Sequence, residues 1–136
     1  MCGIPGSGKT TLATQLSQEY DLALYSYDYL RNNRRPEWGC ISAYLLELVI
    51  QSLLDNQSVI VDDMYITKES RQKLLSAISD IECKKTLIVL QTPLELCIER
   101  DRTRTSHNLG KPIVCNFNKK YEPPSLEEGW DEILYY

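Results

Sequence analysis

The stretch GIPGSGKT at residues 3–10 decides the fold of this chain. It fits the pattern G-x-x-x-x-G-K-[ST], whose fixed positions are taken by Gly3, Gly8, Lys9 and Thr10. Glycines let successive backbone N–H groups turn inward around phosphate oxygens, the lysine adds a cation, and the threonine hydroxyl can bind Mg²⁺. An ordinary glycine-rich turn would need the glycines but not the Lys-Thr pair. The pattern therefore predicts a phosphate-binding loop.

A helix is expected directly after this loop. In TTLATQLSQEY at residues 10–20, Leu12, Ala13 and Leu16 recur at helical spacing. The N-terminal end of such a helix favours the same anion as the loop, because its N–H groups and its dipole point toward it. The residues expected to bind the nucleotide here are Gly3, Pro5, Gly6, Ser7, Gly8, Lys9, Thr10 and Thr11.

The start of the chain is unusual for such a loop. A phosphate loop normally follows a buried strand, but only Met1 and Cys2 precede Gly3. Either the chain is part of a longer protein, or upstream residues were omitted, or the fold lacks the anchoring strand. Because loss of a central strand leaves its neighbours unpaired, we expect marginal stability.

Composition and cysteine usage narrow the class of protein. A length of 136 residues, 43% hydrophobic and 25% charged, predicts one globular domain over residues 1–136. The five cysteines lie far apart without a C-x-x-C pair, which predicts free thiols in a reducing compartment, the cytoplasm. No apolar run reaches membrane-spanning length, so no membrane partner is expected. The net charge of −4 argues against avid nonspecific binding to nucleic acid but leaves room for a local basic patch.

Strands and helices are predicted to alternate after the loop. A short strand is expected at 22–26, buried strands at 58–63 and 85–90, and an edge strand at 131–136. Helices are expected at 41–55, at 68–79 behind a Thr67 cap, and from Pro93 to about Arg104 behind a Thr92–Glu95 capping box. This order predicts an α/β doubly wound parallel sheet of the P-loop NTPase type, with its first strand missing.

Charged residues follow two of these strands. Asp28 and Arg31 follow the strand at 22–26, and Asp62 and Asp63 end the strand at 58–63. Ligands of this architecture lie beyond the carboxyl ends of the strands. A carboxylate there can take a proton from a hydroxyl acceptor while a guanidinium holds a phosphate, which are the functions expected of Asp28 and Arg31. The alternative is an aspartate that caps a short helix and an arginine on its surface.

Further side chains could serve the same site. Arg100 and Arg104 lie four residues apart on the helix expected from Pro93, so they would share a face and could both reach a transferring phosphoryl group. The alternative is a solvated helix end. The tyrosines at 25, 27 and 29 alternate and could stack on bases or pack the margin of a sheet. His107 is assigned no role.

These motifs together resemble the polynucleotide-kinase-like, or AAA_33, branch of P-loop kinases, which includes the phage and animal 5′-hydroxyl polynucleotide kinases. The matching segments span nearly the whole chain and are GIPGSGKT, the D-x-x-R of Asp28 and Arg31, VIVDDMYITKESR, TPLELCIERDRTR and KKYEPPSLEEGWDEI. The resemblance implies that Asp28 is the general base, that Arg31 contacts the scissile phosphate, and that Asp63 orients the acceptor. It also implies that Arg100 and Arg104 bind the donor phosphates.

The resemblance implies a kinase that uses ATP and Mg²⁺, with Thr10 and Asp62 as the expected metal ligands. Lys9, Asp28, Arg31, Asp63 and Arg104 form the expected catalytic set, and a polynucleotide 5′-hydroxyl is the leading acceptor. The DDMY stretch and PLELCIERDRTR are also similar to the kinase that phosphorylates seryl-tRNA in selenocysteine synthesis. The alternatives are therefore a metabolite or seryl-tRNA kinase, or a nucleotide-binding fragment that does not catalyse.

Overall fold

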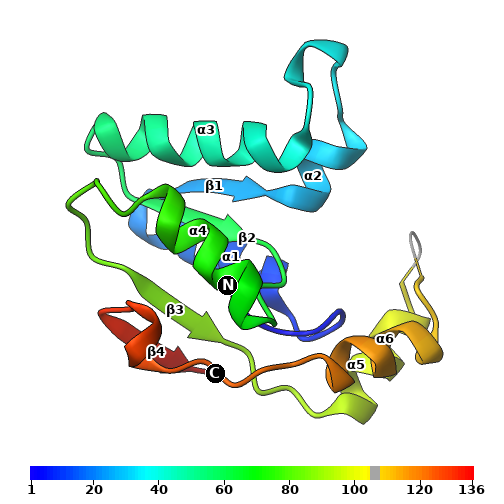
Figure 1. Ribbon diagram of the computed structural model, residues 1–136. Coiled ribbons are helices and arrows are strands. Elements are labelled where there is room, and N and C mark those ends of the chain that lie inside the picture. Colours follow the sequence, from blue (N-terminus) through cyan, green and yellow to red (C-terminus); the bar gives the residue numbers. More distant parts are fainter. Residues whose placement is uncertain (105–107) are drawn as a thin grey trace.

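The computed structural model describes residues 1–104 and 108–136, and His107 lies outside this range. The described elements alternate much as predicted (Figure 1). The strands are β1 (Ala23–Ser26), β2 (Val59–Asp62), β3 (Thr86–Val89) and β4 (Glu132–Tyr135). The helices are α1 (Lys9–Tyr20), α2 (Tyr27–Asn32), α3 (Ile41–Leu54), α4 (Lys68–Ala77), α5 (Leu94–Arg102) and α6 (Lys111–Lys119), with short 3-10 helices η1 (Pro36–Trp38) and η2 (Leu126–Glu128).

The strands form two parallel pairs that flank the first residues of the chain. β1 pairs with β2, and β3 pairs with β4. Between the pairs, the amine of Met1 donates to the carbonyl of Val61 on β2 at 2.9 Å. The N–H of Cys2 donates to Ile88 at 2.7 Å, and the N–H of Leu90 donates back to Cys2 at 2.8 Å. Two residues thus occupy the place of a central strand, as the sequence predicts.

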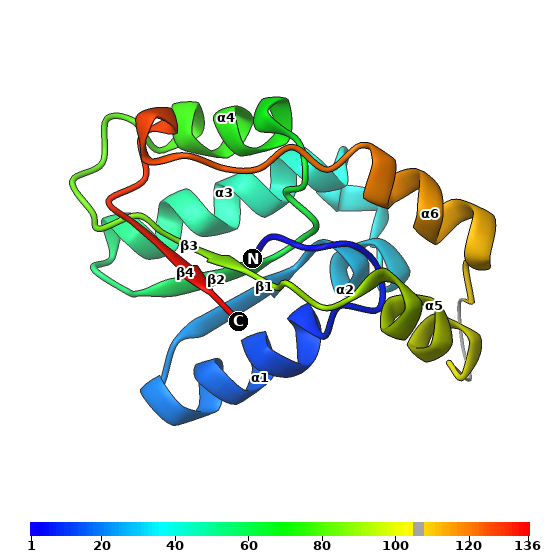
Figure 2. The same ribbon diagram turned by 90° about the horizontal axis from the view of Figure 1, so that it is seen from below.

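Helices cover both faces of these strands, which confirms the doubly wound α/β class. Figure 2 shows α3 and α4 on one face and α1 on the other, with α5 and α6 beyond one end. Met1 packs with Ala13 of α1 and Ile60. Cys2 packs on the opposite face in a cluster with Leu87 and Trp130. Apolar packing on both faces is typical of the central strands of a parallel sheet.

Some details differ from the sequence prediction. The Thr67 cap is confirmed, since its hydroxyl accepts from the N–H of Ser70 at 3.2 Å. The capping box before α5 is wrong, because the Thr92 hydroxyl instead donates to the carbonyl of Ser7 at 2.8 Å. α5 ends at Arg102, so Arg104 lies beyond the helix rather than on its face.

A helix at Asp28 was expected only in the alternative interpretation, and α6 was not predicted. α2 begins at Tyr27, so the tyrosine alternation from Tyr25 does not continue as a strand. α6 follows a carboxylate contact that connects it to α5, because the buried Asp101 accepts from the N–H groups of Leu109 at 3.2 Å and Gly110 at 2.8 Å. The overlooked sequence signal for α6 was Pro112 in its first turn, followed by apolar residues at helical spacing.

The C-terminal segment is held to α4 by a buried ion pair. Arg71 is fully buried and binds both carboxylate oxygens of Glu128, at 2.7 and 2.8 Å. Its Nη1 also donates to the carbonyls of Tyr65 at 3.1 Å and Glu122 at 3.0 Å. A guanidinium can be buried when its donors are satisfied in this way. The YEPPSLEEGWDEI motif therefore has a structural function, which is to fasten β4 and its approach to the domain.

Two sequence expectations concern the surroundings of the protein. All five cysteines are free, as their spacing predicts. In residues 1–104 and 108–136, no helix combines the length and apolarity needed to cross a membrane.

Candidate functional site

The loop at residues 3–8 depends on its glycines for geometric reasons. Gly6 and Gly8 have positive φ angles of 83° and 96°, which strain any residue with a side chain. A Cβ on Gly6 would overlap the carbonyl of Cys97 on α5. A Cβ on Gly3 would lie 2.7 Å from the Ser7 hydroxyl oxygen. The pattern is therefore required by close packing of the loop against itself and α5.

The loop leads into α1 with its backbone donors available. Gly8 caps the helix in the left-handed conformation, and it has no side chain to bind the N–H groups of the first turn. Thr11 lies exposed in that turn, while Pro5 and Ser7 are buried in the loop. The Ser7 hydroxyl is fully buried and has no hydrogen-bond partner among the described residues. A phosphate group at this helix end would meet several free donors.

Lys9 lies between the loop and the end of β2. Its ammonium group donates to the carbonyl of Ile4 at 3.1 Å. Burial lowers the pKa of Lys9, the carboxylates of Asp62 and Asp63 raise it, and the charge of Arg104 lowers it. Lys9 is thus a partly desolvated cation near both carboxylates, where a phosphate would add the negative charge that favours its protonated form.

Thr10 and Asp62 are in direct contact. The Thr10 hydroxyl donates to a carboxylate oxygen of Asp62 at 2.7 Å, and Asp62 is only 5% exposed. The described residues contain no cluster of three or more metal-ligating side chains. Mg²⁺ bound with a nucleotide needs fewer, since it keeps several waters and uses one or two protein oxygens with the phosphates. A hydroxyl and a carboxylate at this distance fit that requirement.

Asp63 points into a different environment from Asp62. One of its oxygens accepts the N–H of Met64 at 2.7 Å. Burial raises the pKa of Asp63, the Met64 hydrogen bond opposes that rise, and the nearby charge of Asp28 adds to it. Asp28 and Asp63 lie near each other because Ser26, which directly precedes α2, is paired in the sheet with Asp62, which directly precedes Asp63.

Asp28 and Arg31 pair with each other on the exposed face of α2. Their side chains are 3.0 Å apart and are 74% and 54% exposed, respectively. The alternative that Asp28 caps the helix is wrong, since Ser26 is the cap and accepts from Tyr29 at 3.4 Å. Both groups remain accessible to a molecule that approaches the carboxyl ends of β1 and β2.

Arg100 and Arg104 reach the loop by separate routes. A guanidinium nitrogen of Arg100 lies 3.6 Å from the position of a Cβ on Gly8. Arg104, after the end of α5, is close enough to lower the pKa of Lys9. Arg100 thus lies beside the loop, whereas Arg104 does not share a helical face with it, and the binding of donor phosphates by both arginines stays a prediction.

Comparison with known proteins agrees with this geometry. The model of the AAA_33 family, described as an AAA domain, matches residues 1–124. The chain belongs to the AAA_33 family. It is 27% identical over 139 residues to the bifunctional polynucleotide phosphatase/kinase of Schizosaccharomyces pombe, covering 98% of the chain and 31% of that protein. It is 24% identical over 141 residues to the L-seryl-tRNA(Sec) kinase of Methanococcus maripaludis, covering 96% of the chain and 54% of that protein.

Solved structures share the fold of this AAA_33 domain. A gluconokinase from Sinorhizobium meliloti 1021 superposes with a TM-score of 0.65 at 18% identity, covering 98% of the chain and 78% of that structure. The AAA_33 domain thus shares the fold of that structure. It spans between 15% and 54% of the length of the curated relatives it matches.

The AAA_33 domain also carries an aromatic and basic cluster on the segment between α2 and α3. Trp38 of η1 stacks on Tyr44 of α3, with ring centroids 4.8 Å apart and planes 16° from parallel. The guanidinium of Arg35 lies 5.7 Å from the centre of the Trp38 ring. The signal was present as RRPEW at residues 34–38, in which two arginines are followed by a tryptophan close after the helix of Asp28 and Arg31.

Proposed function

We propose that this chain is an ATP- and Mg²⁺-dependent phosphotransferase that moves the γ-phosphoryl group to a hydroxyl, with a polynucleotide 5′-hydroxyl as the leading acceptor. The observation that carries the proposal is the placement of carboxylates at the carboxyl ends of the neighbouring strands β1 and β2. Asp62, at the end of β2, accepts a hydrogen bond from the loop threonine, and Asp28, just after β1, is exposed beside Arg31. One position suits a donor and the other an acceptor.

On the donor side, the loop and α1 offer N–H groups to the phosphates, and Lys9 neutralises the outer phosphate charge. Thr10 and Asp62 would hold Mg²⁺, which supplies charge neutralisation between the β- and γ-phosphates when bound. Arg100 and Arg104 approach the same loop and would stabilise charge on the transferring group.

On the acceptor side, the hydroxyl oxygen would attack the γ-phosphorus and lose its proton to a carboxylate oxygen of Asp28, while ADP leaves. Arg31 is in contact with Asp28 and presents its other donors to the phosphate next to the acceptor hydroxyl. Asp63, partly buried and fixed by Met64, would orient the acceptor rather than take its proton.

A nucleic-acid acceptor is favoured by the cluster next to α2. Trp38 is stacked on Tyr44 and has the guanidinium of Arg35 over its ring, so a base that stacks at this cluster would also lie near a cation. Arg34 and Arg35 are both exposed, which provides the local basic patch that the net charge of −4 leaves room for. We further propose that the domain works in a reducing compartment, the cytoplasm, because its five cysteines are free.

The test is phosphate transfer from γ-labelled ATP to a panel of acceptors: 5′-hydroxyl DNA, 5′-hydroxyl RNA, seryl-tRNA and small polyols. Label on the 5′-hydroxyl ends, with none on seryl-tRNA or polyols, is the expected result. Label on seryl-tRNA or a polyol alone would assign the alternative kinase. Nucleotide binding without transfer to any acceptor would indicate the non-catalytic alternative. The Lys9→Ala chain provides the background for each acceptor.

A further inference from the structure

One turn of the backbone beside the candidate site is strained. Among the described residues, three that are not glycine have positive φ angles: Asp21 at 50°, Asn56 at 57° and Tyr65 at 40°. Aspartate and asparagine adopt this left-handed conformation more readily than other residues, whereas a bulky side chain is an outlier there. Such outliers are concentrated at active sites and ligand-binding segments. Tyr65 lies two residues after Asp63, so its conformation points to a function in the candidate site.

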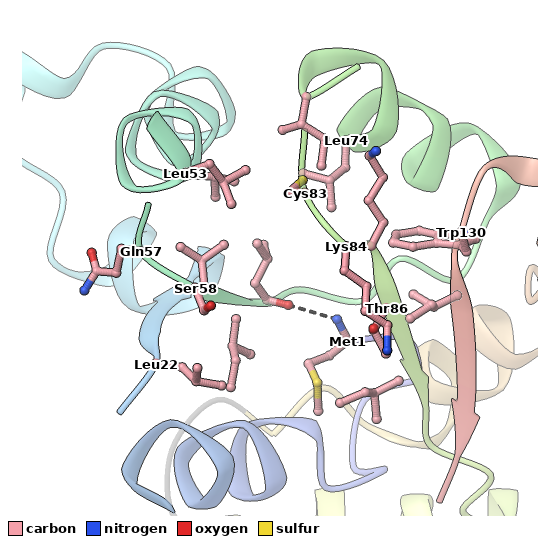
Figure 3. A pocket seen from close by; sticks show the side chains of 18 of the residues that line it. Met1, Leu22, Leu53, Gln57, Ser58, Leu74, Cys83, Lys84, Thr86 and Trp130 are labelled. Atoms are coloured by element: carbon pink, nitrogen blue, oxygen red, sulfur yellow. Dashed lines mark hydrogen bonds between the residues drawn. The ribbon is translucent and has the colours of Figure 1, made fainter. Parts of the chain in front are cut away.

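Two sets of contacts hold Tyr65 in this conformation. Its side chain is 7% exposed and packs in a cluster that includes Leu74 and Trp130. All three residues line the pocket of Figure 3, where Leu74 and Trp130 lie on the side of the strands away from α1. The carbonyl of Tyr65 accepts from Nη1 of the buried Arg71 at 3.1 Å. The core thus fixes both the ring and the carbonyl of Tyr65, which offsets the cost of its left-handed conformation.

The residue before Tyr65 is bonded to both sides of the candidate site. The carbonyl of Met64 accepts the N–H of Gly3, the first glycine of the phosphate loop, at 3.1 Å. The N–H of Met64 donates to the carboxylate of Asp63 at 2.7 Å. Met64 therefore connects the donor-side loop to the carboxylate that we expect to orient the acceptor.

The direction of the Met64 carbonyl depends on the φ angle of Tyr65. This angle rotates the planar peptide group between Met64 and Tyr65 about the N–Cα bond of Tyr65. Because the ring and the carbonyl of Tyr65 are fixed in the core, a change from 40° to the ordinary helical value of about −60° would turn that plane by roughly 100°. The Met64 carbonyl would then no longer face the N–H of Gly3.

We propose that Tyr65 is a positioning residue, whose left-handed conformation directs the Met64 carbonyl to the phosphate loop and thereby fixes Asp63 relative to that loop. Tyr65 acts through Met64 and not on a substrate. The effect on catalysis rests on the phosphotransferase proposed above, whereas the bond from Gly3 to Met64 can be followed without turnover.

Four variants of the full chain separate the conformation of residue 65 from its packing. Tyr65→Phe keeps the ring in the core. Tyr65→Gly and Tyr65→Ala both lose the ring, but glycine adopts a positive φ without strain and alanine does not. Leu75→Ala removes apolar contacts from the same cluster and leaves residue 65 unchanged, so it controls for general loosening of the core.

The main measurement is hydrogen exchange at the Gly3 amide relative to the Leu87 amide, which lies in the β3–β4 pair and reports on opening of the sheet. This ratio should stay within about twofold of wild type in Tyr65→Phe and Leu75→Ala. It should rise in Tyr65→Gly and be at least about fivefold higher still in Tyr65→Ala. Equal ratios for the glycine and alanine variants would overturn the proposal, as would an equal rise in Leu75→Ala and Tyr65→Ala.

Tyr65→Gly keeps the test decisive if Tyr65→Ala does not fold. Because the ring is lost, its exchange ratio should exceed that of Leu75→Ala at least about twofold. An equal ratio in these two variants would overturn the proposal.

Transfer kinetics provide the second readout. Tyr65→Ala should lower kcat at least about tenfold, because Asp63 and the loop are no longer held in register, while ATP affinity by calorimetry changes less than about threefold. Tyr65→Phe should restore kcat. A normal kcat in a Tyr65→Ala chain with a raised exchange ratio would overturn the positioning function. If the wild-type chain transfers phosphate to no acceptor, the proposed phosphotransferase fails, and the exchange ratios still decide whether Tyr65 positions Met64.

Discussion

The two halves of the candidate site are built in different ways. The donor half, residues 3–10 with Asp62, is closely packed and bonded within itself, through Thr10 to Asp62 and Thr92 to Ser7. The acceptor half, α2 with the segment to Trp38, lies on the surface, and its ion pair is largely exposed. The donor half is thus preorganised by backbone geometry, whereas the acceptor half depends on side chains that a substrate would organise.

This difference suggests where specificity varies. Phosphates are the same in every nucleotide, so a loop of fixed shape can bind them in any kinase of this scaffold. Acceptors differ, and exposed side chains on a short helix can change without disturbing the sheet. The predictions below test whether the two halves are separable.

The largest effect is expected from Lys9→Ala in the donor half. Backbone N–H groups cannot replace the lysine charge, so productive nucleotide binding should be abolished. Calorimetric titration with ATP and Mg²⁺ measures this, with Lys111→Ala, at the start of α6, as the matched control. Undiminished transfer by a folded Lys9→Ala protein would contradict the assignment of the loop.

The next effect is expected from Asp28→Asn in the acceptor half. The amide keeps the shape of the side chain but cannot take a proton, so kcat should fall about 10²–10⁴-fold while ATP affinity stays unchanged. Single-turnover transfer alongside calorimetry measures both quantities. Asp63→Asn is the contrast and should reduce kcat less, because Asp63 orients rather than deprotonates. If Asp28→Asn kept its full kcat and Asp63→Asn lost it, Asp63 would be the general base. If Asp28→Asn no longer bound ATP, Asp28 would belong to the donor half.

A smaller effect is expected from Trp38→Ala with a nucleic-acid acceptor. Loss of one stacked base should raise the KM for a 5′-hydroxyl oligonucleotide at least about 5-fold, without changing ATP affinity or the KM for a small polyol. Tyr20→Ala, at an exposed aromatic of α1, is the matched control. An equal KM for the oligonucleotide in wild type and Trp38→Ala would show that the Trp38 cluster does not bind the acceptor.

The smallest effect is expected on stability, from the raised pKa of Asp63. A carboxyl group with a raised folded-state pKa contributes stability below its unfolded pKa, and this contribution is lost as pH rises through the folded pKa. Asp63→Asn cannot ionise and should therefore be more stable than wild type at pH 7, by about 2–4 °C in thermal midpoint. The difference should fall as the pH drops and vanish below about pH 3, where the wild-type carboxyl is protonated in both states. A wild-type midpoint that exceeds the variant at pH 7 would mean that the charge of Asp63 is stabilising.

The sequence was informative where local backbone geometry decides the structure. The loop was predictable because Gly6 and Gly8 must adopt positive φ, and the strand ends were predictable because apolar runs stop at Asp62 and Asp63. The capping box at Thr92 failed because a carbonyl 85 residues away, that of Ser7, competes for its hydroxyl. Long-range partners of this kind have no signature in a local pattern.

The sequence predicted which residues belong to the acceptor half but not how they are arranged in space. The D-x-x-R spacing identified Asp28 and Arg31, yet the sequence alone did not reveal α2, because a six-residue helix is too short to show a period. The stacking of Trp38 on Tyr44 joins η1 to α3 and depends on how the intervening loop folds back. The roles of these residues remain predictions that the variants above test.

The buried pair of Arg71 and Glu128 has a consequence for the order in which the chain folds. The two residues are 57 positions apart in the sequence. β3 likewise pairs with a strand that is synthesised much later, since Thr86 and Glu132, which are in contact, are 46 positions apart. Until Glu128 has been synthesised, the guanidinium of Arg71 has no carboxylate partner, and burial of its unpaired charge would be strongly destabilising. We therefore expect the core under α4 to remain unpacked during synthesis. We therefore expect the domain to fold as one late event rather than progressively from its N-terminus.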